Sequence, residues 1–163
     1  MRLVRPDLAL LDAAVAGDDA LAARLGHAVA PGWVTFAAAL EHTRERLADT
    51  PGDPRWGTCF FVAGEPPALE LVGWGGFKGP PGEGGTVEIG YEIAAGRRGR
   101  GLATDAARTM VAEAFADPAV RRVIAHTLPE PNASNHILGK LGFAFDGDTL
   151  EHGRAAWRWA LPR

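Results

Sequence analysis

Residues 96–104 have the sequence Gly-Arg-Arg-Gly-Arg-Gly-Leu-Ala-Thr. Glycine and arginine, which dominate this segment, are residue types that favour phosphate binding. Gly99 and Gly101 carry no Cβ, so backbone N–H groups at these positions can approach a ligand closely. A helix is expected to follow, and its first turn offers unpaired N–H donors and a partial positive charge. The arginines add charge of the same sign. The segment predicts a phosphate or pyrophosphate cradle, and a glycine-rich connection with solvated arginines is the alternative.

Two common nucleotide-binding motifs do not fit this segment. A P-loop needs Gly-Lys-Ser/Thr after its spacer, and neither lysine of the chain, Lys78 or Lys140, is placed for it. A dinucleotide-binding fingerprint needs a third glycine, where this chain has Ala103 and Thr104. It also needs an acidic residue near the end of the next strand, and 122–128 has none. Both motifs are therefore excluded.

The composition fits one globular domain over residues 1–163. Hydrophobic residues make up 47% of the chain and charged residues 23%, which allows a sizeable single core. A net charge of −3 argues against a general nucleic-acid binder. Cys59 is the only cysteine, so the reducing cytoplasm is the expected location. No apolar run is long enough for a membrane helix, and we expect no membrane partner.

Hydrophobic spacing predicts the elements of the first half. A short strand at 2–5 is followed by a helix that begins after Pro6-Asp7. Its expected inner residues are Leu8, Leu11, Ala14 and Val15. Pro31 suits the first turn of a second helix, which ends in a loop at 50–54. One face of that helix is expected to carry Trp33, Phe36, Leu40, Thr43 and Leu47.

The second half is rich in strands. Residues 57–63 and 69–77 are expected to pair as a hairpin. In 86–93, strict alternation puts Val87, Ile89, Tyr91 and Ile93 on one face and Glu88, Gly90 and Glu92 on the other. The elements expected after the loop 94–101 are a helix with Ala103, Ala106, Met110 and Ala114 inward, a strand at 122–128, a short helix at 133–141, and a closing hairpin of 143–146 with 155–161. The pattern predicts a mixed α/β (α+β) domain.

Three motifs in order resemble the GNAT family of N-acetyltransferases. The run from Arg98 to Ala103 fits the pattern Arg/Gln-x-x-Gly-x-Gly/Ala, and 87–93 is similar to the family's fourth strand. The later runs 132–134 and 137–143 resemble the closing segment of the family. Their sequence is most similar to that of the branch that acetylates ribosomal-protein N-termini. The resemblance implies a central mixed, mostly antiparallel sheet flanked by helices and splayed between the family's fourth and fifth strands.

The resemblance also implies how acetyl-CoA is held. The pyrophosphate would lie on the loop and the helix start, formed by Arg98, Gly99, Arg100, Gly101, Leu102, Ala103 and Thr104. The pantetheine arm would pair with the main chain of Tyr91, Glu92 and Ile93 like an added strand. Asn132 and Ser134 complete the expected contacts. One departure is that Pro131 stands where the branch commonly has asparagine.

The resemblance assigns the base to Glu88, whose pKa burial would raise. An ordinary half-exposed strand glutamate is the equal alternative. Glu92 lies about 13 Å further along the strand at roughly 3.3 Å per residue, so the two are not expected to act as a pair. The family's usual acid is a tyrosine in the helix after strand five, but the only tyrosine here is Tyr91. Ser134 is the expected replacement, and a role for Ser134 or Asn132 as the cap of the following helix stays open.

The expected function is acetyl transfer from acetyl-CoA to a primary amine by direct attack in a ternary complex. The acceptor is a protein N-terminus or a small molecule, and homodimer formation is left open. The alternatives are an acyl-CoA-binding module without turnover and a phosphate-binding domain of another fold. No metal site is expected, because the histidines lack ligand spacing and Cys59 has no partner.

Overall fold

The computed structural model describes residues 1–49 and 52–163. Its central sheet has the strand order β1-β3-β4-β5-β6-β8-β7, with β2 paired to β4 beside this path. The strands are β1 (Arg2–Val4), β2 (Ala28–Val29), β3 (Thr58–Ala63), β4 (Glu70–Phe77), β5 (Thr86–Ile93), β6 (Arg122–Thr127), β7 (Ala144–Glu151) and β8 (Arg154–Pro162). The pairs β5·β6 and β2·β4 are parallel and the other described pairs are antiparallel. The predicted mixed, mostly antiparallel sheet is confirmed.

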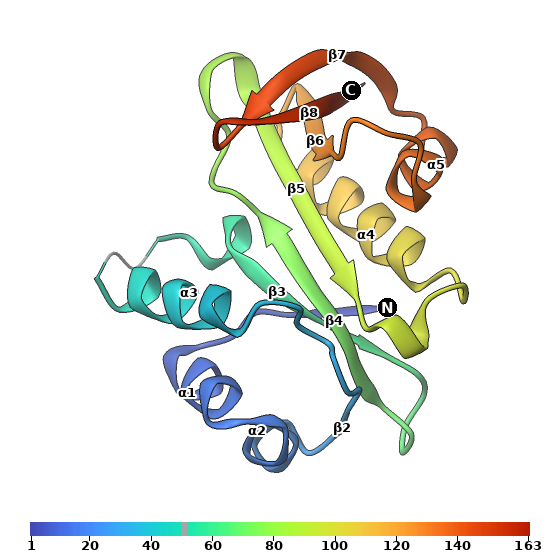
Figure 1. Ribbon diagram of the computed structural model, residues 1–163. Helices are drawn as coiled ribbons and strands as arrows, with labels where there is room; N and C mark the ends of the chain where they lie inside the picture. Colours follow the sequence, from blue (N-terminus) through green and yellow to red (C-terminus); the bar gives the residue numbers. More distant parts are fainter. Residues whose placement is uncertain (50–51) are drawn as a thin grey trace.

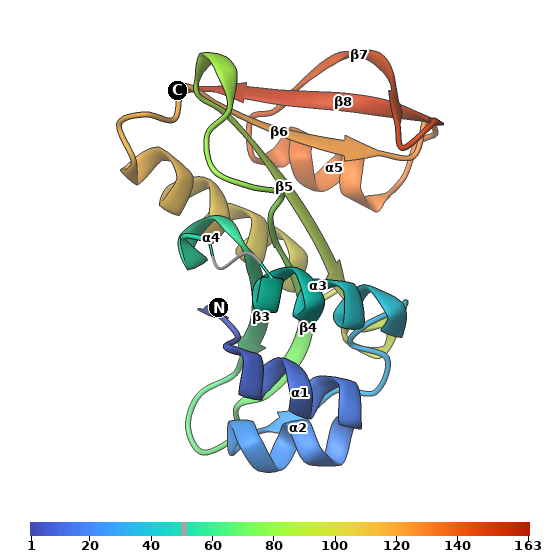
Figure 2. The ribbon, with the colours of Figure 1, turned by 90° about the vertical axis from the view of Figure 1, so that its left-hand side faces the viewer.

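Helices cover both faces of the sheet (Figure 1, Figure 2). They are α1 (Leu8–Ala16), α2 (Asp18–Leu25), α3 (Ala37–Asp49), α4 (Leu102–Ala116) and α5 (Ala133–Lys140), with short 3₁₀ turns η1 (Pro54–Trp56), η2 (Glu83–Gly85) and η3 (Ala95–Arg97). None of the helices in the described residues has the length and apolar character that a membrane crossing requires.

Alternation along β3 shows why there are two cores. Phe60 packs with α1–α3 on one face, whereas Phe61 packs with α4 and α5 on the other. Both side chains are fully buried, so the strand is apolar at successive positions. On the α4 side, Met110 and Leu138 complete the core. The central strands are therefore fixed from both faces.

The N-terminal half differs from the prediction in detail. Asp7 caps α1 as expected, its carboxylate accepting from the Leu10 N–H at 2.8 Å. The inner residues are Leu10, Leu11 and Ala14, while Leu8 and Val15 are 40% and 41% exposed. The helix α2 and the strand β2 were not predicted.

The second predicted helix begins later than expected, at Ala37. Trp33 is buried, but it lies in a turn closed by its N–H donating to the Ala30 carbonyl. Phe36 is 72% exposed and precedes α3, so its expected place on the apolar face of that helix is wrong. Two residues of the predicted loop at 50–54 lie outside the described part of the chain.

The later elements agree with the prediction, except that the closing hairpin is longer, because β7 extends to Glu151. The splay predicted between the family's fourth and fifth strands is confirmed in β5 and β6 (Figure 1). These strands pair only over 86–88 with 122–124. Beyond that point β5 stays paired to β4 and β6 to β8, so residues 89–93 have a free edge toward β6.

Candidate functional site

The glycine-rich loop closes the far end of the splay, between β5 and α4. Gly99 and Gly101 have φ angles of 76° and 78°, in the left-handed region that favours glycine. Apart from the adjacent residues in sequence, a Cβ at either position would meet no atom of the described residues within 4 Å. Gly101 precedes α4 without a side-chain cap, so the first-turn N–H groups of 102–104 have no capping partner. The loop therefore has backbone donors and open space in front of it.

The arginines of this loop have different roles. Arg97 forms two hydrogen bonds of 2.7 Å to the Glu70 carboxylate, which hold the loop against β4. This guanidinium lowers the pKa of the Glu70 carboxyl. Arg98 donates from Nε to the Ile93 carbonyl at 3.0 Å, fixing the end of β5 to the loop. The charge of Arg97 is thus paired with that of Glu70, whereas Arg98 and Arg100 are exposed and would supply the positive charge of the predicted cradle.

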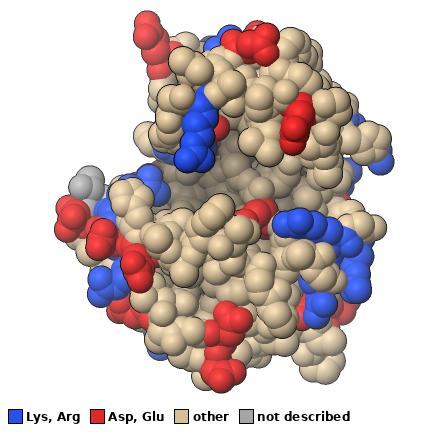
Figure 3. All heavy atoms as spheres, in the orientation of Figure 1, with Lys and Arg blue, Asp and Glu red and all other residues tan. Residues whose placement is uncertain are grey.

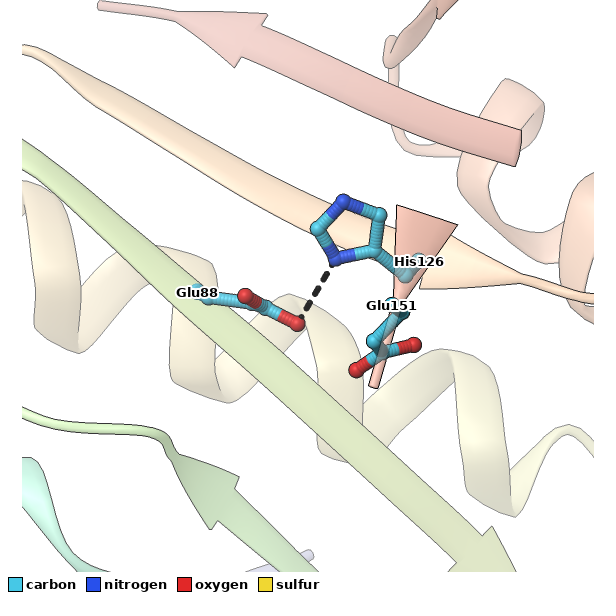
Figure 4. A group of neighbouring side chains, drawn as sticks. All are labelled: Glu88, His126 and Glu151. Atoms are coloured by element: carbon cyan, nitrogen blue, oxygen red, sulfur yellow. Dashed lines mark hydrogen bonds and ion pairs between the residues drawn. The ribbon is translucent and has the colours of Figure 1, made fainter. Parts of the chain in front are cut away.

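At the opposite end of the splay, Glu88 lies in a cluster of titratable side chains (Figure 4). Glu88 is in the last residue pair of β5 with β6, and its Oε1 lies 2.9 Å from Nδ1 of His126. Lys78, which follows β4, places its ammonium against Oε1 of Glu88 and Oε1 of Glu151. The side chains of Glu88 and His126 are only 19% and 13% exposed. Three strands and the loop residue after β4 thus converge on one half-buried polar cluster.

The charges of this cluster stabilise one another. Burial alone would lower the pKa of Lys78, but the Glu151 and Glu88 carboxylates outweigh it and raise that pKa. Burial likewise opposes ionisation of Glu151, yet its pKa is lowered, because the Lys78 ammonium dominates. Glu88, His126 and Glu151 also offer ligand atoms within 4.8 Å of one another, of types that bind a divalent cation. Here the ammonium of Lys78 is the cation that the two carboxylates hold.

Glu92 is on the same strand as Glu88 but is engaged elsewhere. Its carboxylate accepts from the Thr35 N–H at 3.1 Å, from the Thr35 hydroxyl at 2.6 Å and from the Trp74 indole N–H. These contacts tie the segment before α3 to β4 and β5. The expectation that Glu88 and Glu92 do not act as a pair agrees with this geometry.

The helix α5 begins beside the splay, and Asn132 is its cap. The Asn132 side-chain oxygen accepts from the Asn135 N–H at 3.1 Å. The open question of which residue caps the helix is therefore resolved in favour of Asn132, and the Ser134 hydroxyl is not needed for that purpose. Ser134 is half-buried in the first turn of α5.

The Tyr91 hydroxyl lies near Ser134. Within the described residues this buried hydroxyl has no partner in hydrogen-bond geometry. Burial raises the pKa of Tyr91 to about 12, and the neighbouring Ser134 hydroxyl opposes part of that rise. The Asn135 side-chain oxygen is also buried without a partner in the described chain. Two buried polar atoms, the Tyr91 hydroxyl of β5 and the Asn135 side-chain oxygen of α5, thus have no hydrogen-bond partner among the described residues.

Figure 3 shows that this face of the molecule is hollowed across its middle, over β5 between α3 and the β7–β8 hairpin. A separate pocket of about 300 Å³ lies between α1, α3 and η1. Its lining includes Asp53, Trp56 and Pro80, from the two loops around 50–56 and 78–85. Lys78 is the first residue of the second of these loops, and the two residues after it, Gly79 and Pro80, line the pocket.

Sequence reasoning identified Glu88 but missed its three partners. His126 could have been found from strand pairing, because Val123, Ala125 and Thr127 are buried and alternation puts His126 on the other face. The contact of Lys78 with Glu151 spans 73 residues and depends on where the β7–β8 hairpin turns. No local sequence pattern indicates that position.

Comparisons with known proteins agree with the fold and the motifs. The model of the acetyltransferase (GNAT) domain matches residues 2–144. An uncharacterized N-acetyltransferase of Bacillus subtilis, YjdG, is 30% identical over 154 residues, which are 93% of this chain and 90% of that protein.

Solved structures share the fold over the whole chain. A ribosomal-protein-alanine N-acetyltransferase from Brucella melitensis has a TM-score of 0.65 at 22% identity, with 100% of each chain covered. The microcin C7 self-immunity acetyltransferase MccE, solved with acetyl-CoA and AMP, has a TM-score of 0.64 at 15% identity, with 99% of this chain and 91% of that chain covered. The chain belongs to the GNAT family of N-acetyltransferases, and it is an enzyme of that family.

Proposed function

We propose that the enzyme transfers an acetyl group from acetyl-CoA to a primary amine, by direct attack of the amine in a ternary complex. The observation that carries the proposal is the splay between β5 and β6, with a glycine-rich helix start at one end and Glu88 at the other. The acceptor is the N-terminus of a protein or a small-molecule amine. An extended ligand in the splay would bring its phosphates and its acyl group to these two ends.

The residues at the loop fit acetyl-CoA. The N–H groups of 102–104, the open space at Gly99 and Gly101, and the charges of Arg98 and Arg100 suit a pyrophosphate. The free edge of 89–93, with the main chain of Tyr91, Glu92 and Ile93, suits the amide groups of a pantetheine arm. When bound, acetyl-CoA supplies an activated acetyl thioester.

Glu88 is the proposed base. It is half-buried at the edge of the splay, and it already contacts an ammonium group, that of Lys78. A base must lie within hydrogen-bond reach of the proton that it accepts. His126 is a positioning residue, because its ring holds Oε1 of Glu88 at 2.9 Å.

Ser134 is the proposed hydrogen-bond donor to the departing sulfur. Capping of α5 by Asn132 leaves the Ser134 hydroxyl available, at a helix start that itself favours negative charge. A model thiol has a pKa of about 8.5, so one donor and the helix start are sufficient for a thiolate to leave. Asn132 is proposed to contact acetyl-CoA only through the helix start that it caps.

A thiol-release assay tests the function. The protein is incubated with acetyl-CoA and a panel of peptides and aliphatic amines, and free CoA thiol is measured with each acceptor and without one. We expect thiol release that depends on the amine, with a product heavier by one acetyl group in mass spectrometry. Stabilisation by acetyl-CoA without any amine-dependent release would instead favour an acyl-CoA-binding module.

A further inference from the structure

One primary amine of the chain already lies at the proposed base. The Nζ atom of Lys78 contacts Oε1 of Glu88 and Oε1 of Glu151. The residues come from three places: Lys78 follows β4, Glu88 lies in β5 and Glu151 ends β7. The side chains of the carboxylates are 19% and 30% exposed, against 43% for the lysine. The side chains of the two carboxylates are therefore more enclosed than the lysine side chain that reaches them.

This contact puts an amine where the acceptor must come. A general base has to reach the amine whose proton it accepts, whichever molecule carries that amine. An acceptor ammonium and the Lys78 ammonium would both need Oε1 of Glu88, which also faces His126. The two ammonium groups cannot occupy the same position together.

We propose that Glu88 and Glu151 form the binding position for the primary ammonium of the acceptor, and that Lys78 fills this position until an acceptor displaces it. The inference rests on the proposed function, because it takes the acceptor to react beside Glu88. It adds Glu151 as a specificity-determining residue and Lys78 as an internal competitor of the substrate.

The chain around Lys78 allows its side chain to leave without disturbing the sheet. The Lys78 N–H donates to the Glu88 carbonyl at 3.0 Å, so the main chain stays fixed. The Lys78 side chain is a flexible four-carbon stem and is 43% exposed. Ion pairs of this exposure are individually weak, so an incoming ammonium can replace the lysine.

The chemistry of the position selects among amines. An ammonium has three N–H donors, and the two carboxylates take two of them. An acceptor with its own carboxylate beside the amine, such as a free α-amino acid, meets like charge from Glu88 and Glu151. The position therefore fits a peptide N-terminus or an aliphatic amine that has no neighbouring carboxylate.

Binding of a simple amine tests this inference without acetyl transfer. The probe is n-butylammonium, titrated without acetyl-CoA into wild-type protein, Lys78→Met and Lys140→Met. Lys140 is the only other lysine and lies in the last turn of α5, so it gives a matched loss of charge. We expect Lys78→Met to bind the probe about two- to fivefold more tightly, the amount lost to a weak competing ion pair. Lys140→Met should bind it like the wild type.

Three further measurements complete the test. In wild-type protein with ¹³C-labelled lysine, the probe should shift the signal of Lys78 and leave that of Lys140 unchanged. Glu151→Gln in the Lys78→Met background should weaken probe binding, and glycine should bind less tightly than glycine methyl ester.

The outcomes separate this inference from the proposed function. Equal affinity of the wild type and Lys78→Met for the probe, with an unmoved Lys78 signal, overturns the inference even if the enzyme acetylates amines. Absence of amine-dependent thiol release overturns the proposed function, and it does so whatever the probe titrations give.

Discussion

The two ends of β5 are built in different ways. At the Ile93 end, backbone N–H groups, two left-handed glycines and a helix start form the site, and side chains mainly hold the loop in place. At the Glu88 end, three side chains from other strands and loops surround one carboxylate. A site of backbone groups suits a ligand that is the same throughout a family, whereas a site of side chains can change with each acceptor. Under the proposed function, the acceptor specificity of this enzyme would therefore lie at the Glu88 end.

The largest expected effect is at the side-chain end. Glu88→Gln keeps the shape of the side chain but removes its proton affinity, so turnover should fall roughly 10²–10⁴-fold. Acetyl-CoA binding, measured by thermal stabilisation, should persist because the proposed cradle is at the other end of β5. If Glu88→Gln kept the turnover of the wild type at every pH, Glu88 would have no part in the mechanism.

Glu92→Gln is the matched control, since it makes the same change on the same strand. Glu92 holds Thr35 and Trp74, so its loss should lower the melting temperature. Turnover per folded molecule should fall far less than in Glu88→Gln. An equal loss in both variants would contradict the separation of their roles.

Ser134 gives the next largest effect. Ser134→Ala should lower kcat on the order of 10–10³-fold with little change in apparent affinity for acetyl-CoA, because one donor to developing charge is lost. Ser134→Cys should retain part of the activity. The measurements are kcat and melting temperature on the same sample.

Asn132→Ala separates capping from catalysis. It removes the side chain that accepts from the Asn135 N–H, which should cost about 1 kcal/mol of stability. Its kcat should fall less than that of Ser134→Ala. If Ser134→Ala lowers the melting temperature but leaves kcat unchanged, Ser134 has no part in the reaction.

At the Ile93 end of β5, we predict that a substitution of Gly101 abolishes acetyl-CoA binding. Gly101→Val places a branched side chain in the open space before α4 and at a φ of 78°, which valine rarely adopts. Thermal stabilisation by acetyl-CoA should disappear. Gly96→Val is the control in the same loop, because its φ is not in the left-handed region and its surroundings are also open. Unchanged stabilisation in Gly101→Val would show that the cradle is misplaced.

The same contrast explains what the sequence could predict. The alternation of 86–93 and the glycine pattern of 96–101 are local, so β5, the loop and the start of α4 were found. The N-terminal helices were found only in part, because the burial of Trp33 comes from a turn rather than from helical spacing. The partners of Glu88 depend on strand order and on where a distant hairpin turns, and neither is a local property of the chain.

The smallest expected effect concerns the attachment of the loop to β4. The Arg97 guanidinium lowers the pKa of Glu70, so the folded state holds this carboxyl ionised more strongly than the unfolded chain does. Such a pair stabilises the protein above the unfolded pKa of about 4.3, and the stabilisation is lost as the pH falls through the folded pKa. Glu70→Gln should therefore lower the free energy of unfolding at pH 7 by about 0.2–1 kcal/mol, as for other solvent-screened pairs.

The pH dependence of that difference separates an ion pair from simple packing. Denaturant unfolding of the wild type and of Glu70→Gln should differ at pH 7, and this difference should shrink as the pH falls through the lowered pKa of the wild-type Glu70 carboxyl. Added salt at pH 7 should also reduce the difference, because it screens a partly exposed pair. A difference that does not change while the wild-type Glu70 carboxyl becomes protonated would mean that Glu70 acts through its shape rather than its charge. In that case Arg97 would remain available to the cradle, and the contrast between a backbone end and a side-chain end of β5 would weaken.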